Sequence, residues 1–213
     1  MNTQLPKISI VVPSYNQGIF LEHALESIFS QEYPKLEVIV MDGGSSDKSL
    51  EIIQAYQEKL TYWQSKPDGG QASAINAGMQ HCTGDIVTWL NSDDWYVNDP
   101  FWTVAHAYQE NPGSGLFIGN GFRFKDAEYK PFCPRHIAIS REVLREGLDY
   151  ILQPATFMSH EAWLQSGGLN VDLHYGLDWD LFIRILEKQS AVAMNEFLAV
   201  SRNTNKRKQH RGS

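Results

Sequence analysis

The sequence contains little cysteine and no paired cysteine motif. Its 213 residues include two cysteines, Cys82 and Cys133, which are too far apart for a CxxC pair. Neither a disulfide framework nor a zinc site is therefore indicated. Two reduced thiols are typical of a protein in a reducing compartment. We accordingly expect a cytoplasmic location.

Long apolar runs and an excess of positive charge are also missing. No uninterrupted apolar segment approaches the roughly 20 residues that a membrane-spanning helix needs. The opening MNTQLPK does not have the pattern of a secretion signal, so none is expected. The formal net charge of −7 gives no electrostatic reason to expect a nucleic-acid partner, which usually requires a basic surface.

The C-terminal segment differs from the rest of the chain in charge. Residues 202–213 include no acidic residue and five basic ones: Arg202, Lys206, Arg207, Lys208 and Arg211. One interpretation is a solvated terminus. The other is a basic arm that contacts a phosphate group or the anionic inner face of a membrane, which would make the protein peripheral to the membrane.

Strand-like and helix-like segments alternate over the first half of the chain. Apolar runs that end in turn residues predict strands within 8–16, where Pro13 stops the strand, and at 36–44, 60–65 and 85–90. Apolar residues at helical spacing predict helices at 18–31, 45–60 and 69–82, the second of them capped by Ser46 or Asp47. Such alternation predicts an α/β fold with a Rossmann-like, mostly parallel sheet and helices on both faces.

The second half of the sequence predicts a mixture of elements. Helices are expected at 101–109, 161–169 and 177–189, a strand or strand pair at 114–124, and a last strand at 197–202. We find no internal repeat and no linker, so we expect a single domain, 1–213. Within it we expect a nucleotide-binding half at about 6–97, an acceptor half at about 98–202 and a basic tail at 203–213. The sequence does not indicate an oligomeric state.

Acidic residues gather at the expected carboxyl ends of the parallel strands, where ligands of such sheets bind. The segments at these ends are 13–16, 42–47, 68–71 and 91–94, and three of the four contain aspartate. A row of carboxylates repels a phosphate group unless a cation lies between them. The adjacent Asp93 and Asp94 therefore predict a site for Mg²⁺ or Mn²⁺. Alternatively, one of the two caps the helix that follows.

Five segments of the sequence together resemble a known family. IVVPSYN, VMDGGSSDKS, KPDGGQASAINAG, TGDIVTWLNSDDWY and LDWDLFIRI occur in the order found in inverting family 2 glycosyltransferases with the GT-A fold. The resemblance extends over about 8–202, and it rests on the order and spacing of segments that are individually weak signals. It implies metal-dependent transfer of a sugar from a nucleotide-sugar donor, UDP-sugar foremost, to a hydroxyl of a glycan or a lipid-linked acceptor.

The resemblance also assigns nucleotide-binding residues in the first half of the chain. It implies that Tyr15 packs on the base, in a loop shaped by Pro13 and Asn16. Asp42 is implied to accept a hydrogen bond from the base, which requires an acceptor facing an imide N–H. Asp68 is implied to lie beside the ribose and the diphosphate.

The remaining assignments concern the sugar, the metal and the acceptor. Asn76 is implied to lie beside the diphosphate, Asp93 to contact the ribose or the sugar and share the metal site, and Asp94 to bind the metal. Asp178 is implied to be the base that takes the proton of the acceptor hydroxyl. Its alternative role is that of a first-turn acid favoured by the helix dipole. Two acceptor-side residues are expected: Gln153 and Trp179.

Other functions are compatible with parts of the sequence. Leu177 occupies the position where the family usually has glutamate, which leaves open a catalytically weak or inactive relative that binds nucleotide sugars. An oxidoreductase on a similar sheet is disfavoured because no GxGxxG follows the first strand. A phosphotransferase is disfavoured because the sequence has no P-loop.

Overall fold

One twisted sheet forms the framework of the protein. In a computed structural model, which describes residues 4–97, 99–133, 142, 144, 151–173 and 175–203, nine strands form this sheet. Their order is β3-β2-β1-β4-β8-β6-β9-β5, and β7 pairs with β6. The predicted α/β class is confirmed by this arrangement.

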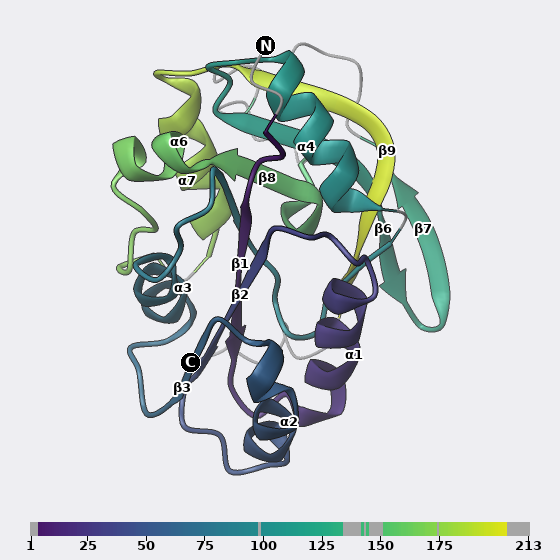
Figure 1. Cartoon of the computed structure of the whole chain (residues 1–213), viewed down its shortest axis with the longest axis vertical. Coiled ribbons are helices and arrows are strands. Elements are labelled where there is room, and N and C mark those ends of the chain that lie inside the picture. The colour runs from purple at the N-terminus through teal and green to yellow at the C-terminus, as the bar shows by residue number, and fades with distance from the viewer. Residues whose placement is uncertain are drawn as a thin grey trace.

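The first half of the chain forms the parallel part of the sheet (Figure 1). Strand β1 pairs in parallel with β2 and β4, and β2 pairs in parallel with β3. The strands are β1 (Ile8–Ser14), β2 (Leu36–Asp42), β3 (Tyr62–Ser65) and β4 (Ile86–Trp89). The helical segments between them are α1 (Gly18–Phe29), α2 (Ser49–Tyr56), the 3₁₀ turn η1 (Gln57–Lys59) and α3 (Gln71–Met79).

The second half of the chain extends the sheet with mixed pairing. Strand β8 is antiparallel to β4 and β6, whereas β9 runs parallel to β6 and antiparallel to β5. The strands are β5 (Trp95–Tyr96), β6 (Leu116–Lys125), β7 (Glu128–Phe132), β8 (Thr156–Ser159) and β9 (Ala191–Arg202). The helical segments are α4 (Pro100–Glu110), the 3₁₀ turn η2 (Gln153–Ala155), α6 (His160–Ser166) and α7 (Leu177–Leu186).

Both faces of the sheet are covered because the side chains of a strand alternate between them. Ile8, Ile10 and Val12 of β1 belong to one core cluster, together with residues of α1, α2 and α4. Val11 belongs to the cluster on the opposite face, which α3, α6 and α7 cover. Figure 1 shows these two groups of helices on either side of the strands.

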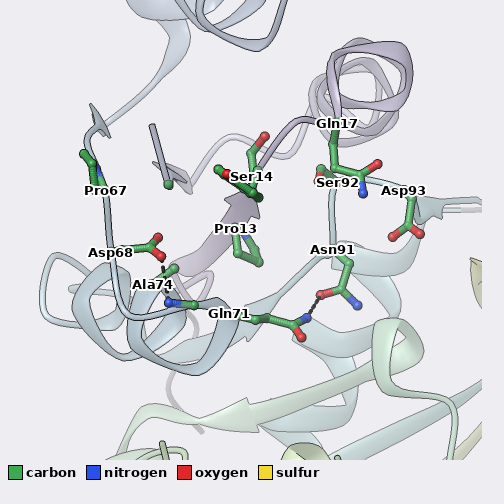
Figure 2. Close-up of a pocket in the computed structure, with 13 residues that line it drawn as sticks. Pro13, Ser14, Gln17, Pro67, Asp68, Gln71, Ala74, Asn91, Ser92 and Asp93 are labelled. Carbon is green, nitrogen blue, oxygen red and sulfur yellow. Dashed lines mark hydrogen bonds between the residues drawn. The ribbon is translucent and has the colours of Figure 1, made fainter. Parts of the chain in front are cut away.

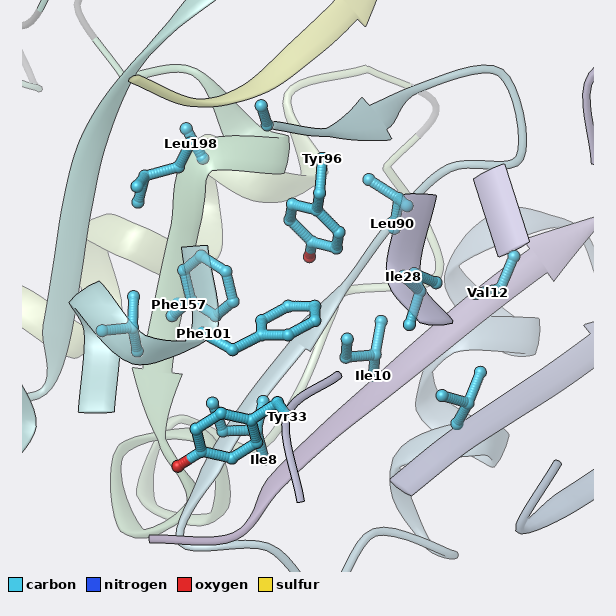
Figure 3. Close-up of a cluster of buried hydrophobic side chains, with 14 of the residues drawn as sticks. Ile8, Ile10, Val12, Ile28, Tyr33, Leu90, Tyr96, Phe101, Phe157 and Leu198 are labelled. Carbon is cyan, nitrogen blue, oxygen red and sulfur yellow. The ribbon is translucent and has the colours of Figure 1, made fainter. Parts of the chain in front are cut away.

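Aromatic side chains join the second half of the chain to this core (Figure 3). The ring of Phe101 on α4 packs edge-on against Tyr96 of β5 and Phe157 of β8, at centroid distances of 5.1 and 6.3 Å. All three side chains are at least nine-tenths buried. This packing explains why the short β5 and β8 are stable where they lie.

Two sequence predictions concern contact with a membrane. Among the described residues, no helix combines the length and the apolar composition that crossing a bilayer requires. Of the predicted basic tail at 203–213, Asn203 is described, and 204–213 lie outside the described residues. Its contact with a membrane stays a prediction.

Candidate active site

Two adjoining cavities lie at the carboxyl ends of β1, β2 and β4. The first has a volume of about 610 Å³ and is shown in Figure 2. Its walls come from the loop after β1, the loop before α3 and the loop after β4. The residues that line it include Pro13, Tyr15, Asp68, Gln71, Asn91 and Asp93. The predicted gathering of these loops at one edge of the sheet is thus seen in the structure.

The second cavity lies on the side of the sheet edge that faces α7. Its volume is about 580 Å³. Apolar side chains of 151–154 and of the loop at 169 form part of its wall, and its polar residues include Asp94, Gln153 and Asp178. The cavity therefore brings together a predicted metal ligand, a predicted acceptor contact and the predicted base, although the sequence places them far apart.

Asp94 is held in a fixed orientation by the protein. Its side chain is almost completely buried, and its Oδ1 accepts a 2.7 Å hydrogen bond from the backbone N–H of Arg202. Its Oδ2 accepts a 3.2 Å hydrogen bond from Nδ2 of Asn91. Asp93 lies half-buried in the wall of the first cavity, and its carbonyl oxygen accepts a hydrogen bond from Nε of Arg202. The two adjacent acids thus lie where the cavities adjoin, with Asp93 in the wall of the first and Asp94 in the wall of the second.

The donor set of this acid pair suits a hard divalent cation that also binds phosphate. Mg²⁺ and Mn²⁺ in such sites take one or two carboxylates from the protein and complete their shell with water and substrate phosphates. No cluster of three or more His, Cys, Asp or Glu side chains that could enclose a metal exists within the described ranges. Asp93 and Asp94 could therefore hold a cation together with a phosphorylated ligand.

A chain of amides crosses from the second cavity to the first. Nε2 of Gln153 donates to the carbonyl oxygen of Trp89 at 2.8 Å, and its Oε1 accepts from Nδ2 of Asn91 at 3.3 Å. Oδ1 of Asn91 accepts a 2.6 Å hydrogen bond from Nε2 of Gln71, which Figure 2 shows as a dashed line. Gln153 is predicted from the sequence as an acceptor contact, but no sequence pattern indicates that its amide orients Asn91.

The predicted base-binding residues lie around the first cavity. The ring of Tyr15 is 63% exposed in the wall of this cavity, and Pro13 lies beside it. Asn16 follows Tyr15 in the loop, and its Oδ1 accepts the backbone N–H of Ser46 at 2.9 Å. Its φ of 52° places it in the left-handed region, which asparagine tolerates better than most residues. Asn16 thus shapes the loop that presents Tyr15.

Asp42 lies at the end of β2 and is 1% exposed. Its Oδ2 accepts hydrogen bonds from the backbone N–H groups of Gly44 and Ser45 and from the hydroxyl of Ser65, at 3.1, 2.9 and 2.7 Å. Oδ1 accepts the hydroxyl of Ser45. These bonds hold the loop after β2 in place. The predicted contact between Asp42 and a base stays a prediction.

Gly43, in the loop after β2, lies close to two residues of the first cavity. A Cβ atom at this position would lie 3.2 Å from Oδ2 of Asp68 and 3.2 Å from the ring of Tyr15. A larger side chain would therefore crowd the two residues that line the cavity. Asp68 itself is exposed, and its Oδ1 accepts the backbone N–H of Gly70 at 2.7 Å, just before α3 begins.

Asn76 lies on α3 beside the cavities rather than in their linings. Its Nδ2 donates to the carbonyl oxygen of Leu169 at 2.8 Å, and its Oδ1 accepts the N–H of the same residue at 2.9 Å. The amide thereby holds the 168–169 loop against α3. The structure gives Asn76 this positioning role, and its predicted nucleotide contact stays a prediction.

The predicted base and its neighbours lie at the start of α7. Asp178 is partly buried in the wall of the second cavity, and its Oδ1 accepts the N–H of Trp179 at 3.0 Å. Trp179 is partly buried and packs against the second core cluster. Tyr175, which the sequence analysis did not single out, lines the cavity with a 69% exposed side chain. The predicted acceptor contact of Trp179 stays a prediction.

Comparison with known proteins places the chain in a family. The family model for Glycosyl transferase family 2 matches residues 9–166. A Mycobacterium tuberculosis protein described as an uncharacterized glycosyltransferase is 34% identical over 184 residues, which are 85% of this chain and 70% of that protein. A similarly described Rickettsia typhi protein is 28% identical over 210 residues, and the match spans 94% of this chain and 65% of that protein.

Solved structures show the same architecture. TarS of S. aureus in complex with UDP-GlcNAc superposes with a TM-score of 0.76 at 19% identity, over 93% of this chain and 59% of that one. The mannosyltransferase PcManGT from Pyrobaculum calidifontis, in complex with GDP-Man and Mn²⁺, superposes with a TM-score of 0.68 at 25% identity, over 93% of this chain and 57% of that one. The fold is the predicted GT-A fold, and the chain belongs to glycosyltransferase family 2.

Proposed function

We propose that this chain transfers a sugar from a nucleotide-sugar donor to a hydroxyl group of an acceptor, with inversion at the anomeric carbon. The observation that carries the proposal is the pair of adjoining cavities, with the acid pair between them and Asp178 in the second. The first cavity would hold the nucleoside diphosphate, and the second would hold the acceptor. We expect the acceptor to be a glycan or a lipid-linked molecule.

The first cavity offers the groups that a nucleoside diphosphate requires. The exposed ring of Tyr15 provides an apolar surface for a base, and the N-terminal end of α3 at Gly70 and Gln71 lies in the wall. A helix N-terminus favours an anion because its backbone N–H groups are unpaired and its dipole is positive there. The UDP-GlcNAc of TarS and the GDP-Man of PcManGT support a nucleotide-sugar donor. We favour UDP as the nucleotide.

A divalent cation, Mn²⁺ or Mg²⁺, would be held by Asp94 with Asp93. When bound, it would neutralise the charge that builds up on the leaving diphosphate. The Mn²⁺ in the PcManGT complex supports this assignment. The hydrogen bonds from Arg202 and Asn91 fix the Asp94 carboxylate before any ligand arrives, so little reorganisation is needed.

The reaction requires one proton transfer by the protein. The acceptor oxygen forms a bond to the anomeric carbon as the bond from that carbon to the diphosphate oxygen breaks. The leaving diphosphate keeps the electron pair, and the carboxylate of Asp178 takes the hydroxyl proton. Attack from the face opposite the leaving group inverts the anomeric configuration without a covalent sugar–enzyme intermediate. A single base is sufficient for this course.

A donor screen tests the proposal. The protein is incubated with Mn²⁺ and, in turn, with UDP-glucose, UDP-galactose, UDP-GlcNAc and GDP-mannose, and released nucleotide is measured by mass spectrometry with and without simple saccharide acceptors. We expect metal-dependent release of UDP from at least one donor. Binding of UDP without release from any donor would favour the alternative of an inactive nucleotide-sugar-binding relative. Failure to bind UDP or GDP would contradict the proposal.

A further inference from the structure

Two residues lie at the junction of the cavities. Gln71 and Asn91 are the only described residues that line both the first and the second cavity. If the proposed function is correct, the leaving diphosphate lies in the first cavity and the attacking hydroxyl in the second. The transferred sugar must then lie between them, against the side chains at the junction. The inference that follows rests on that function.

Asn91 has no N–H group left for a sugar. Its Nδ2 donates to both Oδ2 of Asp94 and Oε1 of Gln153, and one lone pair of its Oδ1 accepts from Gln71. The side chain cannot turn over, because Gln153 is itself oriented by its bond to the carbonyl oxygen of Trp89. Asn91 is therefore a positioning residue that fixes its two neighbours.

Gln71 retains hydrogen-bonding capacity at the same place. Asn91 Oδ1 is an acceptor, so it must meet the Nε2 end of the Gln71 amide, and this fixes which way the amide points. Among the described residues, the side-chain amide of Gln71 makes only this hydrogen bond. Its Oε1 and the second N–H of its Nε2 therefore remain available. The side chain is exposed where it lines both cavities, as Figure 2 shows for the first.

We propose that Gln71 hydrogen-bonds a hydroxyl or acetamido group of the transferred sugar and thereby sets the donor-sugar preference. Oε1 would accept from a sugar hydroxyl, and the free N–H would donate to a sugar oxygen. Because the amide chain from Trp89 fixes the orientation, the protein presents an acceptor and a donor in a defined order. A sugar whose substituents do not match leaves one of these groups unpaired.

Calorimetry of Gln71→Leu separates this role from a structural one. We measure the binding of UDP and of the UDP-sugar that the wild type binds most tightly, both with Mn²⁺. If the wild type prefers GDP and GDP-mannose, these two ligands replace them. Leucine keeps much of the side-chain bulk and removes the amide. We expect the affinity for the nucleotide sugar to fall about tenfold relative to the affinity for the free nucleoside diphosphate, as the loss of a hydrogen bond to a ligand predicts.

Gln17→Leu is the matched control, because Gln17 lines the first cavity alone. We expect any effect of that substitution to fall equally on the nucleotide and the nucleotide sugar. An equal loss of both ligands in Gln71→Leu would mean that the residue only supports Asn91 and Asp94, and would overturn the inference. Wild-type affinities for both ligands in Gln71→Leu would also overturn it. If the wild type binds neither ligand, the proposed function itself fails, which is a separate outcome.

Discussion

The backbone N–H of Arg202 donates a 2.7 Å hydrogen bond to Oδ1 of Asp94, which lies 108 residues earlier in the chain. The bond joins the end of β9, the last strand, to the buried acid that follows β4. The guanidinium group of Arg202 packs over three aromatic rings, those of Phe20, Trp95 and Phe124. The position of the Asp94 carboxylate therefore depends on the packing of the Arg202 side chain on these rings.

Replacing Arg202 tests this dependence. Arg202→Ala keeps the backbone N–H but removes the cation from the rings and the bond to the carbonyl of Asp93. We expect the affinity for UDP with Mn²⁺ to fall about tenfold, since a partly desolvated cation–π contact contributes on the order of 1–2 kcal/mol. Calorimetry measures the effect. Lys59→Ala is the control, because it removes a cation over Phe29 and Tyr56 far from the site. Equal UDP affinities in wild type and Arg202→Ala would contradict the account.

Asp178→Asn separates donor binding from proton transfer. We expect UDP affinity to be unchanged and the rate of sugar transfer to fall by about 10²–10⁴-fold, which is the usual contribution of a general base. The matched control is Asp180→Asn on the same helix turn. Asp180 pairs with Arg184 at 2.7 Å, so its loss should affect stability by less than about 1 kcal/mol and leave turnover intact. An active Asp178→Asn would show that another group takes the proton.

Ionisation of Glu37 makes the free energy of unfolding depend on pH in the acid range. Burial alone would raise the pKa of this carboxyl, but hydrogen bonds from Ser9, Thr83 and Lys7 outweigh it and lower the pKa from 4.5 to about 2. The side chain is 13% exposed. Because the folded pKa is the lower one, the stabilisation is present above pH 4.5 and is lost as the pH falls from 4.5 towards 2.

Urea unfolding of wild type and Glu37→Gln measures this contribution. We expect a difference in unfolding free energy of up to about 3 kcal/mol near pH 6, which shrinks steadily as the pH is lowered through 4.5. A difference of the same size at pH 6 and pH 3 would show that ionisation of Glu37 is not its source.

The two thiols should differ in reactivity. Cys133 is exposed, whereas Cys82 is buried against α3 and burial raises its pKa to about 12. Only the thiolate reacts rapidly, so a thiol reagent at pH 8 should modify Cys133 quickly and Cys82 only after unfolding. Mass spectrometry of the native protein should show one modified cysteine at early times. Rapid modification of both would mean that the sheet opens near Cys82.

The parallel half of the fold was predictable because its signals are local. β1 and β4 are short buried runs, such as Ile86–Trp89, whereas β2 and β3 are partly buried, and turn residues follow each of the four strands. The first strand was predicted to stop at Pro13, but Pro13 and Ser14 still pair with β2, and the chain turns only at the left-handed Asn16. In contrast, β5 has only two residues, and β8 runs directly from the 3₁₀ turn Gln153–Ala155 into α6, which begins at His160, so no loop marks either of its ends.

The site was predictable in outline but not in its connections. Asp93, Asp94 and Asp178 stand in motifs, and motifs are read from neighbouring residues. The bond from Arg202 to Asp94 and the bond from Gln153 to the carbonyl of Trp89 join segments distant in sequence. Such contacts are set by tertiary packing, which no local pattern encodes. Gln71 carries a signal only because it stands at the start of a helix that follows glycines.

The most direct test of the account is a calorimetric titration of UDP into the wild type and into Asp94→Asn, each with and without Mn²⁺. Asparagine keeps the size of the side chain and the oxygen that accepts from Arg202, but it removes the negative charge. We expect Mn²⁺ to strengthen UDP binding by the wild type at least about tenfold and to have no effect in Asp94→Asn. Equal UDP binding by both proteins, independent of Mn²⁺, would contradict the central claim that this acid holds a cation against the diphosphate.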